Sequence, residues 1–137
     1  RYEDVVPTVH IALRCERRLL DLRINARARA MFERGLVEEV ETLVDQGIRE
    51  GETAPRAIGY AQALAVIDGT MSVPEAVDST ALATRQLASR QIKWFRRDPR
   101  LHWIDVALTE TGQCTDSERS RLTRRAWELV CTHRGVA

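Results

Sequence analysis

Metal ligands and disulfide partners are scarce in this sequence of 137 residues. It contains three cysteines and three histidines, which are Cys15, Cys114, Cys131, His10, His102 and His133. None of them shows the spacing of a metal site, and an odd number of scattered cysteines is typical of free thiols in a reducing cytosol. We therefore expect no metal ligand and no disulfide in this chain, and we expect a cytoplasmic protein.

Long apolar runs are also absent. No segment approaches the roughly 20 apolar residues that a membrane-spanning helix requires, and residues 1–4 do not resemble a signal peptide. We therefore expect no contact with a membrane. The first residue is not methionine, which indicates that the sequence begins inside a longer protein.

Known catalytic motifs are missing as well. The sequence has no Walker A loop, dinucleotide-binding fingerprint, nucleophile elbow, HExxH motif or paired CxxC. Its carboxylates fall on the polar faces of predicted helices, where solvated side chains are usual. Taken alone, the residues favour binding over catalysis, and we expect no catalytic residue in this chain.

The net charge is only +1, but the charge is unevenly distributed. Residues 38–52 carry six acidic side chains against one arginine, and residues 85–100 carry six basic side chains against one aspartate. Because a local electric field survives such cancellation, the low net charge does not argue against a nucleic acid partner.

Hydrophobic periodicity predicts a mostly helical chain with two strands. Helices are expected at residues 15–34, 36–46, 59–68, 72–97 and 115–133, and strands at residues 9–13 and 101–106, the latter able to be buried on both faces. Residues 47–56 and 107–114 are expected to be loops, and Thr115 and Glu118 have the form of a capping box. Two strands about ninety residues apart do not form a stable sheet by themselves. We therefore expect them to belong to a sheet whose other strands lie outside this sequence.

The long helix at residues 72–97 is predicted to have two contrasting faces. One face holds Val77, Ala81, Thr84, Ala88, Ile92 and Phe95, and the other holds Gln86, Arg90, Lys93, Trp94 and Arg97. Arginine binds phosphate oxygens in a bidentate manner, and an indole stacks on a base. This pattern is typical of a surface for single-stranded or looped RNA. The alternative is an ordinary amphipathic helix with a solvated basic face.

Two other places are candidates for anion binding. Arg23 and Arg27 are four residues apart on a predicted helix, a spacing that can hold a diphosphate between two guanidinium groups. A charged, solvated outer face explains the same spacing. Arg56, Gly59 and Tyr60 lie where a loop enters a helix, and backbone amides at such a junction can bind an anion. The alternative there is a simple helix start with Tyr60 packed beneath it.

These segments, in this order, resemble the C-terminal half of bacterial tRNA dimethylallyltransferases. The matching stretches are Leu22-Arg23-Ile24-x-x-Arg27, Met31 with Gly35-Leu36-Val37-Glu38-Glu39-Val40, Arg56-Ala57-Ile58-Gly59-Tyr60, Gly69, residues 84–97 and Trp103-Ile104-Asp105. The resemblance covers about residues 7–106, most of the chain. Ser89 and Lys93 stand where the family more often has lysine and threonine. Residues 107–137, a loop and a terminal helix, match no known pattern.

The resemblance implies an α/β fold, a parallel sheet like that of P-loop kinases with a helical insertion, to which the two strands of this chain would belong. It implies transfer of a dimethylallyl group from dimethylallyl diphosphate to N6 of the adenosine 3′ of the anticodon, with Mg²⁺ assisting departure of the diphosphate. By position, the residues that inherit contact with the tRNA anticodon stem-loop are Arg56, Gly59, Tyr60, Arg90, Gln91, Lys93, Trp94, Arg96 and Arg97. Arg23 and Arg27 stand where the family's arginines approach the diphosphate.

In this family the phosphate-binding loop and the aspartate that acts as base belong to an N-terminal half that this sequence does not contain. The resemblance therefore implies that residues 1–137 are the C-terminal portion of a transferase, without a complete active site. Two alternatives of other classes remain: a free-standing, non-catalytic helical RNA-binding module, and a helical interaction protein whose acidic helix binds a partner.

Overall fold

A computed structural model describes residues 3–134 of the chain and divides it into two compact units. The strand unit comprises the chain up to Arg23 together with the chain from Ser89 onward, and the helical unit comprises Ile24–Ala88. Two helices, α1 (Arg17–Glu33) and α4 (Val73–Phe95), contribute residues to both units.

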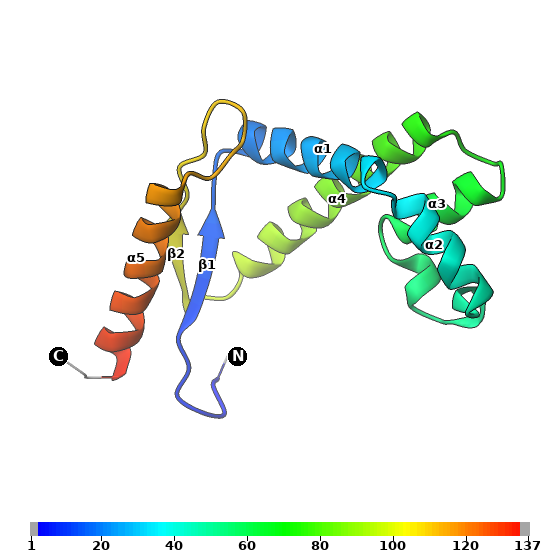
Figure 1. Ribbon diagram of the computed structural model, residues 1–137. Helices are drawn as coiled ribbons and strands as arrows, with labels where there is room; N and C mark the ends of the chain where they lie inside the picture. The colour runs from blue at the N-terminus through cyan, green and yellow to red at the C-terminus, as the bar shows by residue number, and fades with distance from the viewer. Residues whose placement is uncertain (1–2, 135–137) are drawn as a thin grey trace. The chain divides into compact units, whose positions relative to one another are not determined.

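The strand unit contains a two-stranded parallel sheet. Strand β1 (His10–Arg14) pairs with β2 (Leu101–Asp105) in a register that sets His10 opposite Leu101 and Arg14 opposite Asp105 (Figure 1). The sequence predicted both strands to within a residue at each end. The expectation that the second strand is buried on both faces is wrong for the described part of the chain, because His102 and Asp105 are exposed.

Helix α5 (Asp116–Arg134) lies against β2 and is joined to it by a carboxylate. The Glu118 side chain accepts hydrogen bonds from the backbone N–H of Ala107 at 2.8 Å and from the Arg121 guanidinium at 2.6 and 2.8 Å. Arg121 also donates to the carbonyl oxygen of Asp105, the last residue of β2, at 2.6 Å. These bonds lower the pKa of Glu118 to about 2, the bond from Arg121 being the largest cause.

The expected capping box at the start of α5 is only half formed among the described contacts. Thr115 Oγ1 accepts the N–H of Glu118 at 3.2 Å, as predicted. The Glu118 carboxylate does not return the bond to Thr115, because it binds Ala107 and Arg121 instead. A residue that a local pattern assigns to helix capping therefore serves to attach the helix to the sheet.

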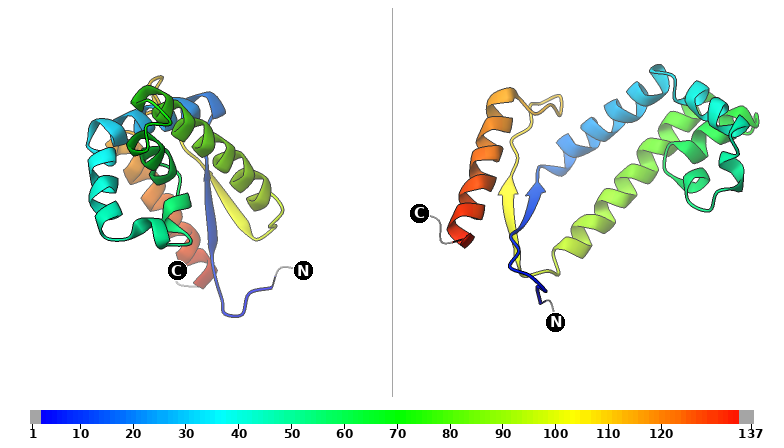
Figure 2. Two further views of the ribbon diagram at one scale, coloured as in Figure 1. Left: turned by 90° about the vertical axis from the view of Figure 1, so that its right-hand side faces the viewer. Right: turned by 60° about the horizontal axis from the view of Figure 1, so that its bottom comes forward.

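The loop between β2 and α5 is folded back on itself and lies close to α1 (Figure 2). The N–H groups of Thr109 and Gly112 donate to the carbonyls of Gln113 and Thr109, each at 2.8 Å. Gly112 has φ +77°, and a Cβ atom there would lie 2.8 Å from the carbonyl oxygen of Leu19. Only glycine fits both the positive φ and this close approach to the α1 backbone.

The helical unit is built around one apolar cluster. Helices α2 (Leu36–Asp45) and α3 (Tyr60–Ile67) contact each other, with short 3-10 turns η1 (Ile48–Glu50) and η2 (Ala54–Arg56) between them. The buried members of the cluster are Phe32, Leu36, Val40, Ala63, Leu64 and Ala76. The sequence predicted these helices and their glycine ends, but it treated residues 47–56 as a plain loop and missed the two 3-10 turns.

The ends of α4 follow the sequence signals. At the N-terminus the Ser72 N–H and hydroxyl both donate to Glu75 Oε2, at 2.8 and 2.6 Å, and the Glu75 N–H lies 3.4 Å from Ser72 Oγ. The helix ends at Phe95, just before Asp98 and Pro99, as the sequence predicted.

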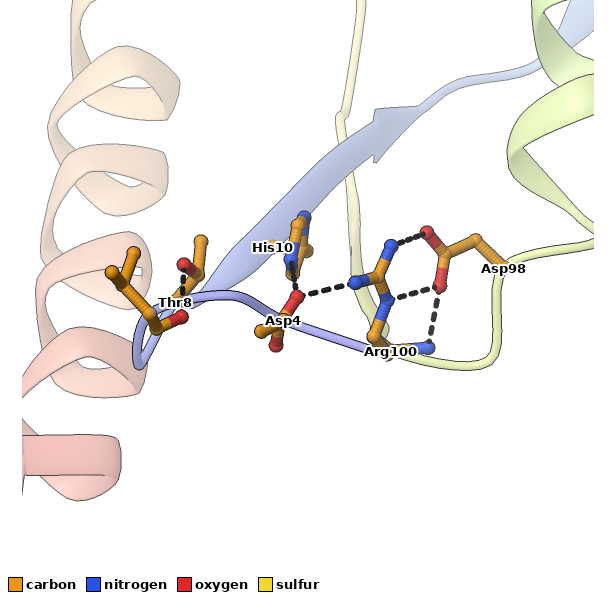
Figure 3. Close-up of polar contacts among 6 residues, drawn as sticks. Asp4, Thr8, His10, Asp98 and Arg100 are labelled. Atoms are coloured by element: carbon orange, nitrogen blue, oxygen red, sulfur yellow. Dashed lines mark hydrogen bonds and ion pairs between the residues drawn. The ribbon is translucent and has the colours of Figure 1, made fainter. Parts of the chain in front are cut away.

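A polar network fixes the connection between α4 and β2 to the start of the chain (Figure 3). Arg100 donates to both carboxylate oxygens of Asp98, at 2.9 and 2.7 Å, and also pairs with Asp4. His10 Nε2 lies 2.8 Å from the same Asp4 carboxylate. The bond from Arg100 is the main reason that the pKa of Asp98 falls to about 2. This network anchors β1 and β2 on the side where both strands begin.

Candidate nucleic-acid interface

The outer face of α4 has the composition that the sequence predicted. Its inward residues Val77, Ala81, Thr84, Ala88, Ile92 and Phe95 are buried or half-buried, and its outward residues Gln86, Arg90, Lys93, Trp94 and Arg97 are exposed. Gln91 and Arg96 are exposed as well. The 3.6-residue period therefore separated the two sides of the helix correctly. We call Arg90, Lys93, Trp94 and Arg97 the basic face.

The charges of this region are not neutralised by nearby carboxylates. Among residues 3–134, no ion pair or side-chain hydrogen bond involves Arg90, Lys93, Arg96 or Arg97. By contrast, Arg85 on the same helix donates to Asn25 Oδ1. Uncompensated, exposed cations attract the phosphate groups of a nucleic acid.

Trp94 adds an aromatic surface to these charges. Trp94 is 61% exposed, which rules out the alternative of an indole packed in the core of the described chain. The ring contacts Phe95, with the two centroids 5.2 Å apart and the planes tilted by 58°. Because Phe95 is half-buried, it supports the indole from the protein side and leaves much of the Trp94 ring open for stacking.

Arg23 and Arg27 lie one turn apart on α1, and both side chains are exposed. Neither forms an ion pair with a carboxylate in the part of the chain that the structure describes. The backbone N–H of Arg23 is close to the loop at Gly112. Both guanidinium groups are therefore available to an anionic ligand.

Arg56, Gly59 and Tyr60 lie together in the helical unit, at the entry to α3. Arg56 is exposed. Gly59 has φ +97°, and its N–H donates to the Gln62 side chain at 2.8 Å, so this amide already has a partner. Tyr60 is half-buried against the apolar cluster. Its hydroxyl donates to Glu39, which raises the pKa of the tyrosine.

A cavity of about 400 Å³ in the strand unit was not anticipated from the sequence. Its lining residues are Arg14, Cys15, Arg17, Leu20, Ser89, Ile92, Lys93, Arg96 and Trp103. Lys93 and Arg96 were predicted to bind RNA, whereas Trp103 was noted only as part of a strand that resembles the family, and Arg14 and Arg17 were given no role. The one available signal was the position of Arg14 at the carboxyl end of a strand, the edge at which parallel sheets bind ligands.

Neither a metal centre nor a membrane span is evident in the described residues. Across residues 3–134, no three histidine, cysteine, aspartate or glutamate side chains are grouped so that they could hold a metal ion. Within the same range, no helix combines the length and apolar character needed to cross a bilayer. The Mg²⁺ that the resemblance implies therefore finds no ligand set among these side chains.

Comparison with protein families gives a match to the model of the IPP transferases over residues 1–98. Among curated proteins, the chain is 52% identical to a tRNA dimethylallyltransferase of Rhodococcus jostii over 109 residues, which cover 77% of the chain and 35% of the relative. It is 52% identical to that of Kineococcus radiotolerans over 124 residues, which cover 90% of the chain and 37% of the relative. A match of 124 residues necessarily includes part of the segment after residue 106.

Two solved structures resemble the chain. The full-length tRNA isopentenylpyrophosphate transferase of Bacillus halodurans gives a TM-score of 0.76 at 29% identity, with 96% of this chain and 42% of that one covered. The tRNA delta(2)-isopentenylpyrophosphate transferase of Staphylococcus epidermidis gives 0.70 at 32% identity, with 88% and 38% covered. The chain thus spans a little over a third of the length of the curated relatives, and it corresponds to their C-terminal part.

Proposed function

This chain belongs to the IPP transferase family, and we propose that it is the tRNA-binding C-terminal part of a tRNA dimethylallyltransferase. The complete enzyme would transfer a dimethylallyl group from dimethylallyl diphosphate to N6 of the adenosine 3′ of the anticodon. In this reaction the N6 nitrogen forms a bond to the allylic carbon, diphosphate leaves, and the nitrogen loses a proton.

The observation that carries the proposal is the basic face of α4. Arg90, Lys93 and the indole of Trp94 are exposed on one side of the helix, Arg97 is exposed in the turn just after it, and the opposite side of the helix is packed. Cations that have no carboxylate partner among residues 3–134 suit the phosphates of an RNA strand, and an indole suits an unstacked base. An anticodon loop offers both groups. Gln91 and Arg96, exposed beside this face, would add further contacts.

In the helical unit, Arg56 is the residue best suited to bind RNA directly. It is exposed, whereas Gly59 and Tyr60 are engaged in contacts of the fold. We assign Arg56 a phosphate contact. Gly59 and the half-buried Tyr60 would shape the α3 entry that presents it.

Arg23 and Arg27 are proposed to approach the diphosphate of the donor. Their spacing on α1 and their lack of a carboxylate partner within the described range support this role. Mg²⁺ would assist the departure of diphosphate, but the described residues offer no ligand set for it. The phosphate-binding loop and the catalytic base are likewise assigned to the part of the enzyme outside this sequence.

The proposal is tested by incubating the full-length protein with dimethylallyl diphosphate, Mg²⁺ and unmodified tRNA, followed by mass spectrometry of the nucleosides. We expect N6-dimethylallyladenosine at the position 3′ of the anticodon. RNA binding without any modified adenosine would instead support a non-catalytic RNA-binding module.

The chain from residue 1 to 137 is expected to give no transfer by itself. It carries groups that bind RNA, but none that we assign to activation of the acceptor adenosine. Product above the level of a protein-free control, with this chain as the only protein, would contradict the proposal that the groups activating the adenosine lie outside residues 1–137.

A further inference from the structure

We propose that the cavity at the carboxyl end of β1 binds a phosphate group of the RNA backbone, next to the basic face of α4. This inference rests on the proposed tRNA-binding function and adds to it a site built largely from residues that the family resemblance does not assign. We refer to it as the β1-end cavity, with the lining residues given above.

Three segments that are distant in the sequence form this cavity within the strand unit. Arg14 and Cys15 come from the end of β1, and Arg17 from the first turn of α1. Lys93 lies in the last turn of α4, and Trp103 lies on β2. A volume of about 400 Å³ falls in the range of roughly 300–1,000 Å³ that is usual for ligand pockets.

The charge of the cavity favours an anion. Four of the lining residues are cations, namely Arg14, Arg17, Lys93 and Arg96. Two of them have carboxylate partners: Arg14 Nε lies 2.5 Å from Asp105, and Arg17 Nε lies 2.9 Å from Asp21. Lys93 and Arg96 have none in the described range, so the cavity keeps a positive excess.

The neutral lining residues do not oppose an anion. Burial raises the pKa of the Cys15 thiol, which therefore stays uncharged near neutral pH. Ser89 Oγ accepts a hydrogen bond from Arg17 Nη1 at 2.7 Å. Together with Asp21, this bond holds the Arg17 guanidinium at the cavity before a ligand arrives, which reduces the entropy that binding costs.

The position of Lys93 indicates RNA as the source of the phosphate. Lys93 belongs both to the basic face and to the cavity lining. An RNA strand that stacks a base on Trp94 therefore has a phosphate within reach of the cavity. Leu20, Ile92 and Trp103 supply apolar surface beside the cations, which suits the nucleoside attached to that phosphate.

The test compares two neighbouring arginines of α1 in the full-length transferase. Arg17→Gln removes a cation from the cavity, and Arg18→Gln removes one that pairs with Glu16 and Glu110 and does not line it. With an unmodified anticodon stem-loop RNA as the probe, we expect Arg17→Gln to weaken binding about tenfold. Its salt slope should fall by about 0.7–0.9, and Arg18→Gln should match the wild type.

A second variant tests the cavity independently, in case Arg17→Gln does not fold properly. Ser89→Asp gives Arg17 a carboxylate partner in place of the hydroxyl and puts a negative charge into the cavity. We expect it to keep the wild-type melting temperature and to weaken RNA binding at least as much as Arg17→Gln. Ser120→Asp on α5, away from the cavity, controls for the added charge.

The possible outcomes distinguish a failure of the cavity proposal from a failure of the proposed function. If Arg90→Ala weakens RNA binding but Arg17→Gln and Ser89→Asp do not, the cavity proposal is wrong and the function stands. A raised KM for dimethylallyl diphosphate with unchanged RNA affinity would also overturn it, because the cavity would then serve the donor. Absence of RNA binding by the wild-type enzyme would remove the proposed function itself.

Discussion

Replacement of Trp94 by alanine tests whether the basic face of α4 binds RNA by stacking as well as by charge. Base–aromatic stacking contributes about 1–3 kcal/mol per base, so we expect the Kd for an anticodon stem-loop RNA to rise by about 5- to 150-fold. The salt slope should stay near that of the wild type, because no cation is removed.

The effect on stability is expected to be small. Replacement of a buried tryptophan by alanine costs about 3–5 kcal/mol of stability, but Trp94 is 61% exposed. The main loss is the tilted contact with Phe95, an interaction worth about 0.5–1.5 kcal/mol. We therefore expect the melting temperature of the full-length enzyme to fall by only a few degrees.

The chain offers a matched control in Trp127 on α5, which is 66% exposed and does not lie on the basic face. Fluorescence anisotropy with labelled RNA over a salt series measures the affinity of each variant, and a melting curve measures its stability. Together they separate a loss of stacking from a loss of stability. Trp94→Phe should recover part of the affinity because it keeps a ring. If Trp94→Ala and Trp127→Ala change the affinity equally, or if affinity falls only in step with melting temperature, the stacking argument is refuted.

Three further predictions concern charge. Arg90→Ala should weaken RNA binding and lower the salt slope by about 0.7–0.9. Arg124→Ala, at an exposed position on α5, should change neither the affinity nor the salt slope. RNA titrations of both variants from low to high salt measure the two quantities. Arg27→Ala should raise the KM for dimethylallyl diphosphate and leave RNA affinity unchanged. The control Arg29→Ala, on another side of α1, should leave both quantities as in the wild type. Equal kinetics for the two variants would indicate that Arg27 is an ordinary solvated surface residue. The pKa of Glu118 is about 2 in the folded chain, against an ordinary 4.5, so the ionised carboxylate stabilises the fold fully above about pH 4.5 and loses this effect as the pH falls toward 2. The melting temperature of the wild type should therefore fall more between pH 5 and pH 3 than that of Glu118→Gln. Equal falls for the two proteins would contradict this stabilising role.

The features that the sequence predicted depend on local spacing. The inner and outer faces of α4 follow from side chains that recur every three or four residues, and Ser72 with Glu75 marks the helix start within four residues. Such patterns are read without knowledge of the tertiary fold. For the same reason, the ends of α1 and α2 at Gly35 and Gly47, both with positive φ, were correctly expected.

The features that the sequence missed depend on contacts between distant segments. Thr115 and Glu118 have the spacing of a capping box, yet the Glu118 carboxylate binds Ala107, eleven residues earlier in the chain. The β1-end cavity joins Arg17 to Trp103 because β1 and β2 pair in parallel, and no periodicity in the sequence reports that pairing. Tertiary hydrogen bonds compete with the local ones, and the local pattern does not show which will form.

The segment after β2, which matched no known pattern in the sequence, is a structural part of the strand unit. Its loop reaches the α1 backbone at Gly112, where a side chain would collide with Leu19. Its helix is attached to the end of β2 through Glu118 and Arg121. Because α1 and β2 both contribute residues to the lining of the β1-end cavity, this segment contacts two of the elements that form it. The lining residues all lie outside this segment, so we expect it to affect the cavity through the placement of α1 and β2 and not through direct contact with a bound phosphate.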